Sequence, residues 1–550
     1  MTLLFHLYEQ EALAADGTPV TLRYGEKGYN HPSAPAYYEA RISQAPEFTR
    51  AIMGEGSFGG RSDISYGVLT LLNGDGALDF WVGLAIDGRA FRILLIEDGE
   101  AYETAVVVLS GIAHSCVPAG DNGDELQVYL RDRQQEFDTP LQTRLLGGTN
   151  VAGIGLDGDA NQEGDGLPKG YGPVRNSEPV VVNSALSIYA VNDTLIQGGL
   201  TPKVGGVPIP LGIQRASPAD LAEMTHAPAP GTVDYFLGAE DLGVFTPCYL
   251  RFGTTPAKKV TVDFDGTVRN GRYLETAADI IRDIAVTCVG IDPVDVDEAD
   301  LALLTTQQPG AVCLYVNSDR DAADAVDAVA QSVGAWWGFD RLSRFRLQRV
   351  EDPAALDPVL TIRRFGLGTA TTPQDGDAIS VAFEKSDQVG WGAIPACGVK
   401  LSYDHNPTTL AESDLYGSTG TGDPDPVGGA TVRAWLKGEW RIVVWPEDST
   451  VRDAVRARHP LSDWITPETG LRDRVAAVAE AARQFALHGV PRRSVVVPVQ
   501  EDPAVAAILD LGVVVRLHFS RFGFDEGRTF LVTKLTYRLR DRVADMTVWG

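Results

Sequence analysis

Residues 48–95 restrict the possible folds more than any other part of the chain, because apolar runs alternate there with short turn signals. The apolar runs are residues 67–72, 80–86 and 91–95. They are joined by Asn-Gly-Asp-Gly at residues 73–76 and Asp-Gly-Arg at residues 87–89, and such dipeptides favour the tight turns of β-hairpins. The pattern predicts a three-stranded β-meander after a glycine-rich approach, without a cluster of catalytic residue types.

The rest of the first 132 residues shows the same pattern. Further strands are predicted at residues 20–24, 37–42, 105–112 and 126–130, and Asp-Asn-Gly at residues 121–123 marks another turn. Closely spaced strands with turn signals between them are typical of an all-β sandwich or barrel.

A glycine-rich connector at residues 147–172 leads to a second group of predicted strands. These strands lie at residues 180–182, 187–191, 249–252 and 259–264. A short helix is predicted to start after Ser217, because serine is a favoured N-cap and Pro218 suits the first helical position.

The middle of the chain changes from strands to helices alternating with strands, which predicts an α/β segment. Its predicted helices are residues 277–286, with Thr276 as the N-cap, 298–304, with Asp297 as the N-cap, and 322–333. A strand is predicted at residues 345–347. Beyond a Gly/Asp/Pro-rich loop at residues 416–429, the longest helical pattern covers residues 471–487. Strands return at the end of the chain, at residues 513–519, 530–539 and 546–549.

The chain is therefore expected to be mostly β with an α/β middle, an α+β multidomain protein with β-barrels or sandwiches near both ends. At ~150 residues per domain, 550 residues suggest three or four domains. The expected domains are an N-terminal β-barrel or sandwich (1–135), a connector and second β domain (136–270), an inserted α/β domain (271–350), and a C-terminal mixed domain ending in a β-barrel (351–550).

The formal net charge of −27, from 47 basic and 74 acidic residues, disfavours a nucleic-acid clamp, which must neutralise phosphates. The charge can serve solubility, or it can line a conduit from which DNA is repelled and along which it slides. Five scattered cysteines without a CxxC pair indicate buried thiols instead of a disulfide framework or zinc ribbon. Neither a secretory signal nor a ~20-residue apolar span is recognisable, so assembly in a cytoplasm is expected.

Two glycine motifs match G-x-G-x-x-G, at residues 54–59 and 153–158, but neither precedes a predicted helix that could hold a pyrophosphate. The acidic residues at alternate positions of 157–165 resemble the start of a calcium loop. An EF-hand requires glycine and glutamate where Gln162 and Pro168 stand. A solvated acidic turn is the favoured interpretation, and a non-EF calcium site stays open as an alternative.

The remaining candidates for chemistry have structural interpretations. His114-Ser115-Cys116 has no acidic orienting residue nearby, and Trp336-Trp337 follows a predicted helix, where paired aromatics usually fill a core. The aspartates at residues 292, 295 and 297 form a polar run that enters a helix. No catalytic, cofactor-binding or metal-ligating residue is assigned, no cofactor is expected, and the protein is predicted not to be an enzyme.

A faint internal echo links the two ends of the chain. Residues 67–71 and 87–91 resemble residues 512–517 and 526–530, since both pairs read as strand, turn and strand. Any two β-hairpins share this pattern, which is the preferred explanation.

Several blocks, in order along most of the chain, resemble the baseplate or tail-tip hub proteins of long-tailed bacteriophages. They include Phe48-Thr49-Arg50, Gly59-Gly60-Arg61, Leu130-Arg131-Asp132-Arg133, Gly172-Pro173-Val174-Arg175-Asn176, Gly334-Ala335-Trp336-Trp337-Gly338-Phe339, Arg521-Phe522-Gly523 and the closing Thr547-Val548-Trp549-Gly550. These motifs consist of turn and packing residues, so the resemblance carries no functional residue over to this chain.

The resemblance implies a homotrimeric ring at the distal end of the phage tail. Each copy would contribute two tube-like β-barrels, so that three copies match a hexameric tail tube or distal tail ring. The ring would anchor tip or fibre proteins, contact the distal tail protein, tail tube and tape measure, and form the DNA ejection channel without binding DNA specifically. The turn at residues 73–76 is a candidate contact with another subunit or the tube.

Two alternatives belong to other functional classes. One is a phage distal-tail or receptor-binding protein with a carbohydrate-binding β-sandwich. The other, which has less support, is a tail-associated cell-wall hydrolase.

Overall fold

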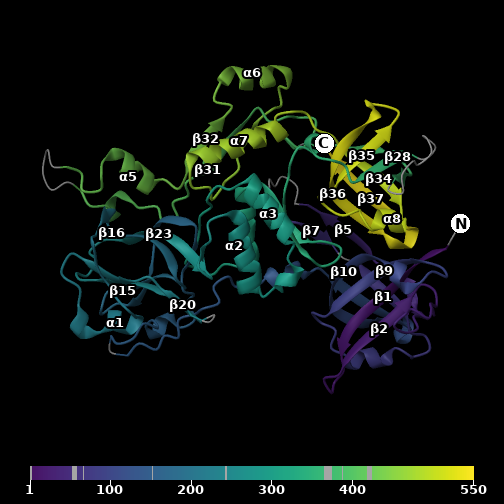
Figure 1. Ribbon diagram of the computed structural model, residues 1–550, viewed down its shortest axis with the longest axis horizontal. Helices are drawn as coiled ribbons and strands as arrows, with labels where there is room; N and C mark the ends of the chain where they lie inside the picture. The colour runs from purple at the N-terminus through teal and green to yellow at the C-terminus, as the bar shows by residue number, and fades with distance from the viewer. Residues whose placement is uncertain are drawn as a thin grey trace.

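The computed structural model describes residues 3–52, 59–65, 67–151, 153–241, 244–364, 375–386, 388–417 and 424–550. The chain is mostly β, and Figure 1 shows most of its strands gathered at the two ends of an elongated molecule, with β31 (Gly398–Tyr403) and β32 (Arg441–Trp445) between them. The N-terminal and C-terminal strands lie together at one end, a second group of strands occupies the other, and helices lie between them.

The N-terminal sheet closes into a barrel. Its strands are β1 (Leu4–Leu13), β2 (Pro19–Gly25), β8 (Val68–Leu72), β9 (Ala90–Glu97), β10 (Val106–Ala119) and β11 (Glu125–Arg131), hydrogen-bonded in the order β2-β1-β9-β10-β11-β8. The edge strand β2 pairs with β3 (Glu39–Ala40), and the other edge, β8, pairs with β4 (Ile42–Gln44). Because only Arg41 separates β3 from β4, this one segment joins both edges of the sheet.

Arg41 holds the seam of the N-terminal barrel. Its backbone N–H donates to Gly25 O (3.0 Å), and its carbonyl accepts from Leu72 N (2.8 Å). Its guanidinium donates to both carboxylate oxygens of Asp75, at 2.7 and 2.8 Å. The same hydrogen bonds lower the pKa of Asp75 to about 2. The turn that follows β8 is thereby tied to the closing segment.

The predicted three-stranded meander is wrong in two respects. Residues 80–86 contain a 3₁₀-helix, η1 (Asp79–Gly83), instead of a strand, and β8 pairs with β11 instead of β9. The helix forms because Asn73 Oδ1 accepts from Leu78 N (2.7 Å), which folds the chain back after β8. Only Trp81 of η1 is buried, and its Nε1–H donates to the Tyr24 hydroxyl (3.1 Å) inside the barrel.

The C-terminal sheet also closes into a barrel. Its strands are β28 (Leu360–Arg364), β29 (Asp375–Ala378), β34 (Ser494–Gln500), β35 (Val514–Phe519), β36 (Phe524–Arg538) and β37 (Val543–Trp549). They pair in the ring β29-β28-β35-β36-β37-β34, and β34 pairs back onto β29 where Ala378 faces Val499. The predicted strands at residues 513–519, 530–539 and 546–549 are confirmed. The strand β30 (Ala382–Glu384) pairs with the start of β34, on the same edge as β29.

The two barrels share one strand order. In each barrel the first two strands of the chain are neighbours, the third follows after an insertion, and the last three form a meander that completes the ring. In chain order, β1, β2, β8, β9, β10 and β11 therefore correspond to β28, β29, β34, β35, β36 and β37. The sequence echo at residues 67–71 and 512–517 instead matches β8 with β35, which occupy different places in the rings. The barrels differ in the direction of one strand. The strand β28 runs parallel to both of its neighbours, whereas the corresponding strand β1 runs antiparallel to both.

A β-sandwich follows the N-terminal barrel in the chain. One sheet contains β13 (Pro173–Ser177), β23 (Val260–Arg269), β16 (Ile196–Val204) and β17 (Val207–Pro208), with β24 (Arg272–Tyr273) beside β23. The other contains β14 (Val180–Asn183), β15 (Ile188–Asn192), β22 (Cys248–Phe252), β19 (Val233–Phe236) and β18 (Leu211–Gln214). Both sheets contribute to one core, and the short helix α1 (Pro218–Ala222) has the predicted Ser217 cap.

The helical middle has its own core, built from two distant parts of the chain. The first part contains α2 (Ala277–Asp283), the π-helix η7 (Ile284–Val289), α3 (Glu298–Gln307), α4 (Ala322–Ser332), β26 (Ala335–Phe339) and β27 (Phe345–Arg349). The second contains β31 (Gly398–Tyr403), β32 (Arg441–Trp445), β33 (Trp464–Ile465) and α7 (Arg474–His488). The predicted helices are confirmed, with the N-caps Thr276 and Asp297 as expected.

The remaining described elements connect these parts. They are β12 (Lys169–Tyr171), β20 (Ala239–Asp241), β21 (Val244–Thr246), β25 (Leu314–Val316), α5 (Ala430–Lys437), α6 (Ser449–Arg458) and α8 (Pro503–Ala506), with several short 3₁₀-helices. Among the helices described, none combines the length and apolar character needed to cross a membrane.

Residues 47–65 leave the N-terminal barrel and join the other units. The strand β5 (Glu47–Ala51) pairs with β36 of the C-terminal barrel, and β7 (Asp63–Ser65) pairs with β5. The strand β6 (Gly60–Arg61) pairs with β26 in the helical middle. A single excursion of the N-terminal segment therefore contributes strands to two other sheets.

We expect that the Arg41→Met change opens the seam of the N-terminal barrel, because it removes the guanidinium bonds to Asp75. Hydrogen exchange followed by mass spectrometry should show the amides of Arg41 and Leu72 exchanging ~5-fold faster or more. The control is Lys27→Met, which breaks an exposed pair with Asp98 on the same barrel. Equal exchange in both variants would contradict the role of Arg41.

Candidate functional site

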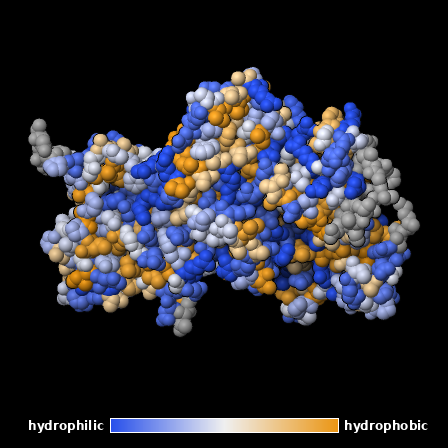
Figure 2. All heavy atoms as spheres, turned by 45° about the horizontal axis from the view of Figure 1, so that its top comes forward, coloured by the Kyte–Doolittle hydropathy of each residue, from blue (hydrophilic) through white to orange (hydrophobic). Residues whose placement is uncertain are grey.

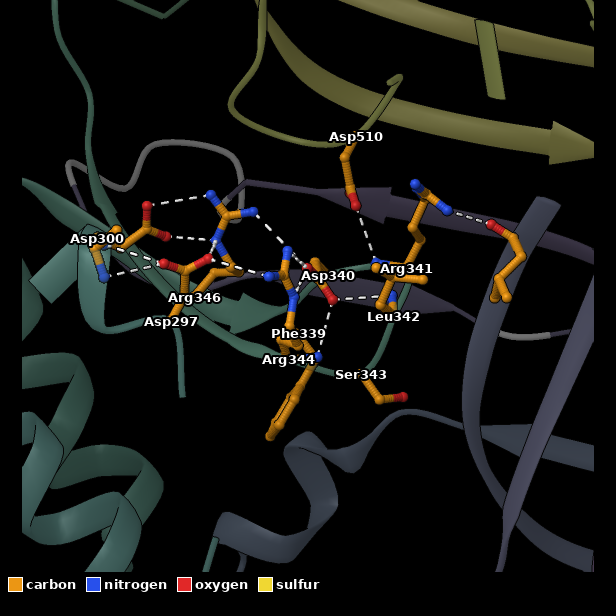
Figure 3. Close-up of polar contacts among 12 residues, drawn as sticks. Asp297, Asp300, Phe339, Asp340, Arg341, Leu342, Ser343, Arg344, Arg346 and Asp510 are labelled. Atoms are coloured by element: carbon orange, nitrogen blue, oxygen red, sulfur yellow. Dashed lines mark hydrogen bonds and ion pairs between the residues drawn. The ribbon is translucent and has the colours of Figure 1, made fainter. Parts of the chain in front are cut away.

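The β-hairpin between β26 and β27 brings its turn to the place where the two barrels and the helical middle meet. We call residues 340–344 the junction turn. Figure 3 shows it pointing toward Asp510 of the C-terminal barrel on one side, with Asp297 and Asp300 on the other. Its backbone and side chains contact all three units.

Asp340 fixes the shape of the junction turn. Its carboxylate accepts from the backbone N–H groups of Leu342 and Arg344, each at 2.9 Å, and from Arg344 Nε at 2.9 Å. Ser343 takes a positive φ of 60°, which lets the chain reverse. The shape of the turn is therefore stabilised by its own side chains, independently of its contacts with the barrels.

Arg341 binds both barrels. Its guanidinium donates to the carbonyl of Val107 in β10 and to the carbonyl of Ala507 just after α8. Its backbone N–H donates to Asp510 Oδ2 (2.9 Å), and its carbonyl accepts from the Ser110 hydroxyl (2.8 Å). One residue of the helical middle thus contacts β10 of the N-terminal barrel and the segment between α8 and β35 of the C-terminal barrel unit.

Arg50 reaches the same point from β5. Its side chain is 2% exposed, and it donates to Asp510 Oδ1 at 2.6 Å and to the carbonyl of Phe339. Burial by itself would raise the pKa of Asp510, but the charge of Arg50 and the donated N–H bonds hold that pKa below its ordinary value. Asp510 is therefore a buried carboxylate that stays charged because residues of two other units neutralise it.

Acidic side chains of α3 extend the junction into the helical middle. Asp297 caps α3 by accepting from Ala299 N (3.2 Å) and Asp300 N (3.3 Å), and it also lies 3.7 Å from Arg344. Arg346 pairs with Asp300 and lies 3.6 Å from Asp297, as Figure 3 shows. The network fixes the base of the hairpin to the start of the helix.

His6 forms a second link between the barrels. It lies in β1, fully buried, with Nδ1 3.2 Å from Glu26 Oε2 and Nε2 3.1 Å from Glu501 Oε2. Glu501 directly follows β34 of the C-terminal barrel. Burial alone would lower the pKa of His6, but the two carboxylates outweigh it and raise the pKa to about 9. His6 is therefore an imidazolium at neutral pH.

The residues tested for chemistry from the sequence have structural roles. Burial raises the pKa of Cys116 to about 11, the opposite of what a thiolate nucleophile requires. Trp336 and Trp337 are buried in cores, at 3% and 0% exposure, so neither offers a face to a sugar. Asp292 accepts from Val294 N (3.0 Å) at the start of a 3₁₀-helix, as a polar run entering helical structure should.

The second glycine motif and the acidic motif lie in loops. Residues 54–58 of the first glycine motif lie outside the described residues, and the second motif leads only to the short 3₁₀-helix η5 (Ala160–Gln162). The Asp157 carboxylate accepts from Gly147 N (2.9 Å) and the Thr149 hydroxyl (2.7 Å). Within the described ranges, no three His, Cys, Asp or Glu side chains are arranged to hold a metal ion.

The structure also explains the turn at residues 73–76, the candidate contact. Asn73 is 5% exposed, and its amide donates to Asp79 Oδ1 (2.9 Å) and Gly123 O (3.2 Å). It therefore organises the loops at one end of the barrel and presents no side chain to a partner itself.

The sequence did not predict any role for His6, Arg341 or Asp510. Arg50 entered the sequence analysis only as part of the Phe48-Thr49-Arg50 block. The one local signal for Arg50 is its position between Phe48 and Ile52, which are both buried. A cation inside an apolar strand needs a buried counter-charge. The counter-charge lies 460 residues away, so the sequence cannot identify it.

Comparisons with known proteins give distant likenesses only. No protein-family model matches the chain, and no curated protein does. A tail protein from Neisseria meningitidis is 9% identical with a TM-score of 0.35, covering 99% of this chain and 96% of that one. The 43 kDa tail protein of a Shewanella oneidensis prophage is 9% identical with a TM-score of 0.39, covering 99% and 97%.

A prophage tail protein from Listeria monocytogenes is 6% identical with a TM-score of 0.25, covering 66% of this chain and 90% of that one. These structural neighbours are tail proteins by their descriptions. At TM-scores below 0.5 the likenesses carry no functional argument for this chain.

We expect Arg50→Met to destabilise the protein by ~3–5 kcal/mol, because it leaves Asp510 buried without its main counter-charge. Urea unfolding measures the loss, and the Arg50→Met/Asp510→Asn double variant should recover part of it. The matched control is Arg282→Met, which breaks an exposed pair with Glu298. A loss no larger than that of the control would contradict the role of Arg50.

We expect the His6→Gln change to destabilise the protein by ~3 kcal/mol at pH 6, falling to little above pH 9. The pKa of His6 is raised from 6.5 to about 9, so its stabilisation is complete below pH 6.5 and is lost as pH rises through 9. Urea unfolding of both proteins at pH 6, 7.5 and 9.5 checks this. If the difference in unfolding free energy between the two proteins increased with pH, the prediction would be contradicted.

Proposed function

We propose that this chain is a structural component of a phage tail tip, a baseplate hub subunit whose ring continues the tail tube. The observation that carries the proposal is the pair of closed barrels with one strand order. Two equivalent barrels in each chain let a ring of three subunits meet a six-fold tube with six similar units. Such matching requires the barrels to keep a fixed relative position, and the contacts of Arg50, Arg341 and His6 would supply it.

The proposed role is mechanical and not enzymatic. The ring would anchor tip or fibre proteins, contact the distal tail protein, tube and tape measure, and form the DNA ejection channel at the distal end of the virion. The β-sandwich and the helical middle, inserted between the barrels, are the parts available for these attachments. We also propose the four-part division at residues 135, 270 and 350 as the order of domains along the chain, with β31, β32, β33 and α7 of the last part adding to the core of the helical middle.

The acidic balance of the chain supports a channel function. A net charge of −27 gives few surfaces that could neutralise phosphates, so passing DNA would be repelled by the ring and not held. The ring would assemble in the host cytoplasm before it joins the tail.

We expect the purified chain to form a trimer, because three copies supply the six barrels. Light scattering coupled to gel filtration measures the mass, and electron cryomicroscopy of the virion locates the chain. A monomer at every concentration, or density for this chain away from the distal end of the tail axis, would overturn the proposal.

A further inference from the structure

The helix α6 stands apart from the body of the molecule. All ten of its residues are described, and none of them is buried. Figure 1 shows it at the top of the view, above α7 and away from both barrels. A helix of this length is marginal in water by itself and is normally stabilised by packing one face. Its exposed surface is therefore suited to a partner.

The surface of α6 is basic and partly apolar. It carries Arg452, Arg456 and Arg458, and the first two guanidiniums lie 5.5 and 5.6 Å from the ring centre of Trp464. Val451 is 42% exposed and Leu461, just beyond the helix, is 74% exposed. In Figure 2 hydrophobic and hydrophilic atoms lie side by side on the top of the molecule, where α6 and α7 lie in Figure 1. In a chain of net charge −27, this combination calls for an acidic and apolar counterpart.

A matching surface lies at one end of the N-terminal barrel. We call it the barrel-end surface, residues 79–82 and 121–124. Its exposed side chains include Asp79, Asp121 and Asp124 together with Phe80 and Val82, which are 51% and 75% exposed. Asn73 holds the two loops together through its bonds to Asp79 and to Gly123 O.

We propose that α6 of one subunit docks on the barrel-end surface of a second copy of this chain. The arginines would face the aspartates, and Val451 and Leu461 would cover Phe80 and Val82. In Figure 1 α6 and the N-terminal barrel lie on different sides of the molecule, so one chain cannot make the contact with itself. The contact is head-to-tail, and such contacts build a ring when the rotation between copies closes. The inference rests on the proposed ring and names the surfaces that close it.

Charge reversal with rescue tests the contact in the full-length chain. The Arg456→Glu/Arg458→Glu variant should weaken self-association ~10-fold or more, and so should Asp121→Lys/Asp124→Lys. The chain that carries all four changes presents opposite charges at every interface again, and its association should return to within ~3-fold of the original. The matched control, Arg521→Glu/Arg540→Glu on the C-terminal barrel, should associate normally. Circular dichroism confirms that each variant is folded.

The outcomes of this experiment distinguish a failure of the proposed contact from a failure of the proposed ring. A chain that forms a trimer in all variants equally retains the proposed function and overturns the contact. A chain that never self-associates overturns both. If reversal at α6 abolishes binding of another tail protein while self-association is unchanged, the occupant of α6 is that protein and the inference is wrong.

Discussion

The buried carboxylate of Asp510 is the constraint on which the arrangement of the units depends. It receives a guanidinium from β5 and a backbone N–H from the junction turn, so three units that could each close separately meet at one charge. Removing a charge from water is costly unless its partners are already in place. The carboxylate therefore favours a single relative position of the units over many loosely packed ones.

This requirement fits a protein built from two barrels of one strand order. Barrels alone satisfy their own backbone hydrogen bonds and gain little from a fixed partner. Here β5 extends the C-terminal barrel from within an insertion of the N-terminal one, and His6 pairs with Glu501 across the same boundary. The links come from strands and a tight turn, which hold position more accurately than long loops. The proposed ring would depend on that rigidity.

Local features of the sequence predicted the structure correctly where a single residue or a short segment determines a helix or strand. The Ser217 and Thr276 caps, the helix over residues 322–333 and the last strands all appear as predicted. The prediction failed at residues 80–86, where apolar residues follow one another but only Trp81 and Ile86 are buried in the barrel core. The sequence echo between residues 67–71 and 512–517 reflects the strand and turn residues that any β-hairpin shares. The two barrels instead resemble each other in strand order, which no short stretch of sequence reveals.

The sequence alone determined the class of the fold, the helices and strands at the ends of the chain, and the acidic balance, because periodicity, caps and composition are local properties. Only the tertiary structure decided that both sheets close, that strands within residues 47–65 join two other sheets, and that Arg50, Arg341 and His6 hold the barrels together. Those features join residues far apart in the sequence, from tens of positions at the Arg41 seam to hundreds at Arg50 and His6. Such contacts are specified by packing and by the need to neutralise buried charge, which no short segment of the chain records.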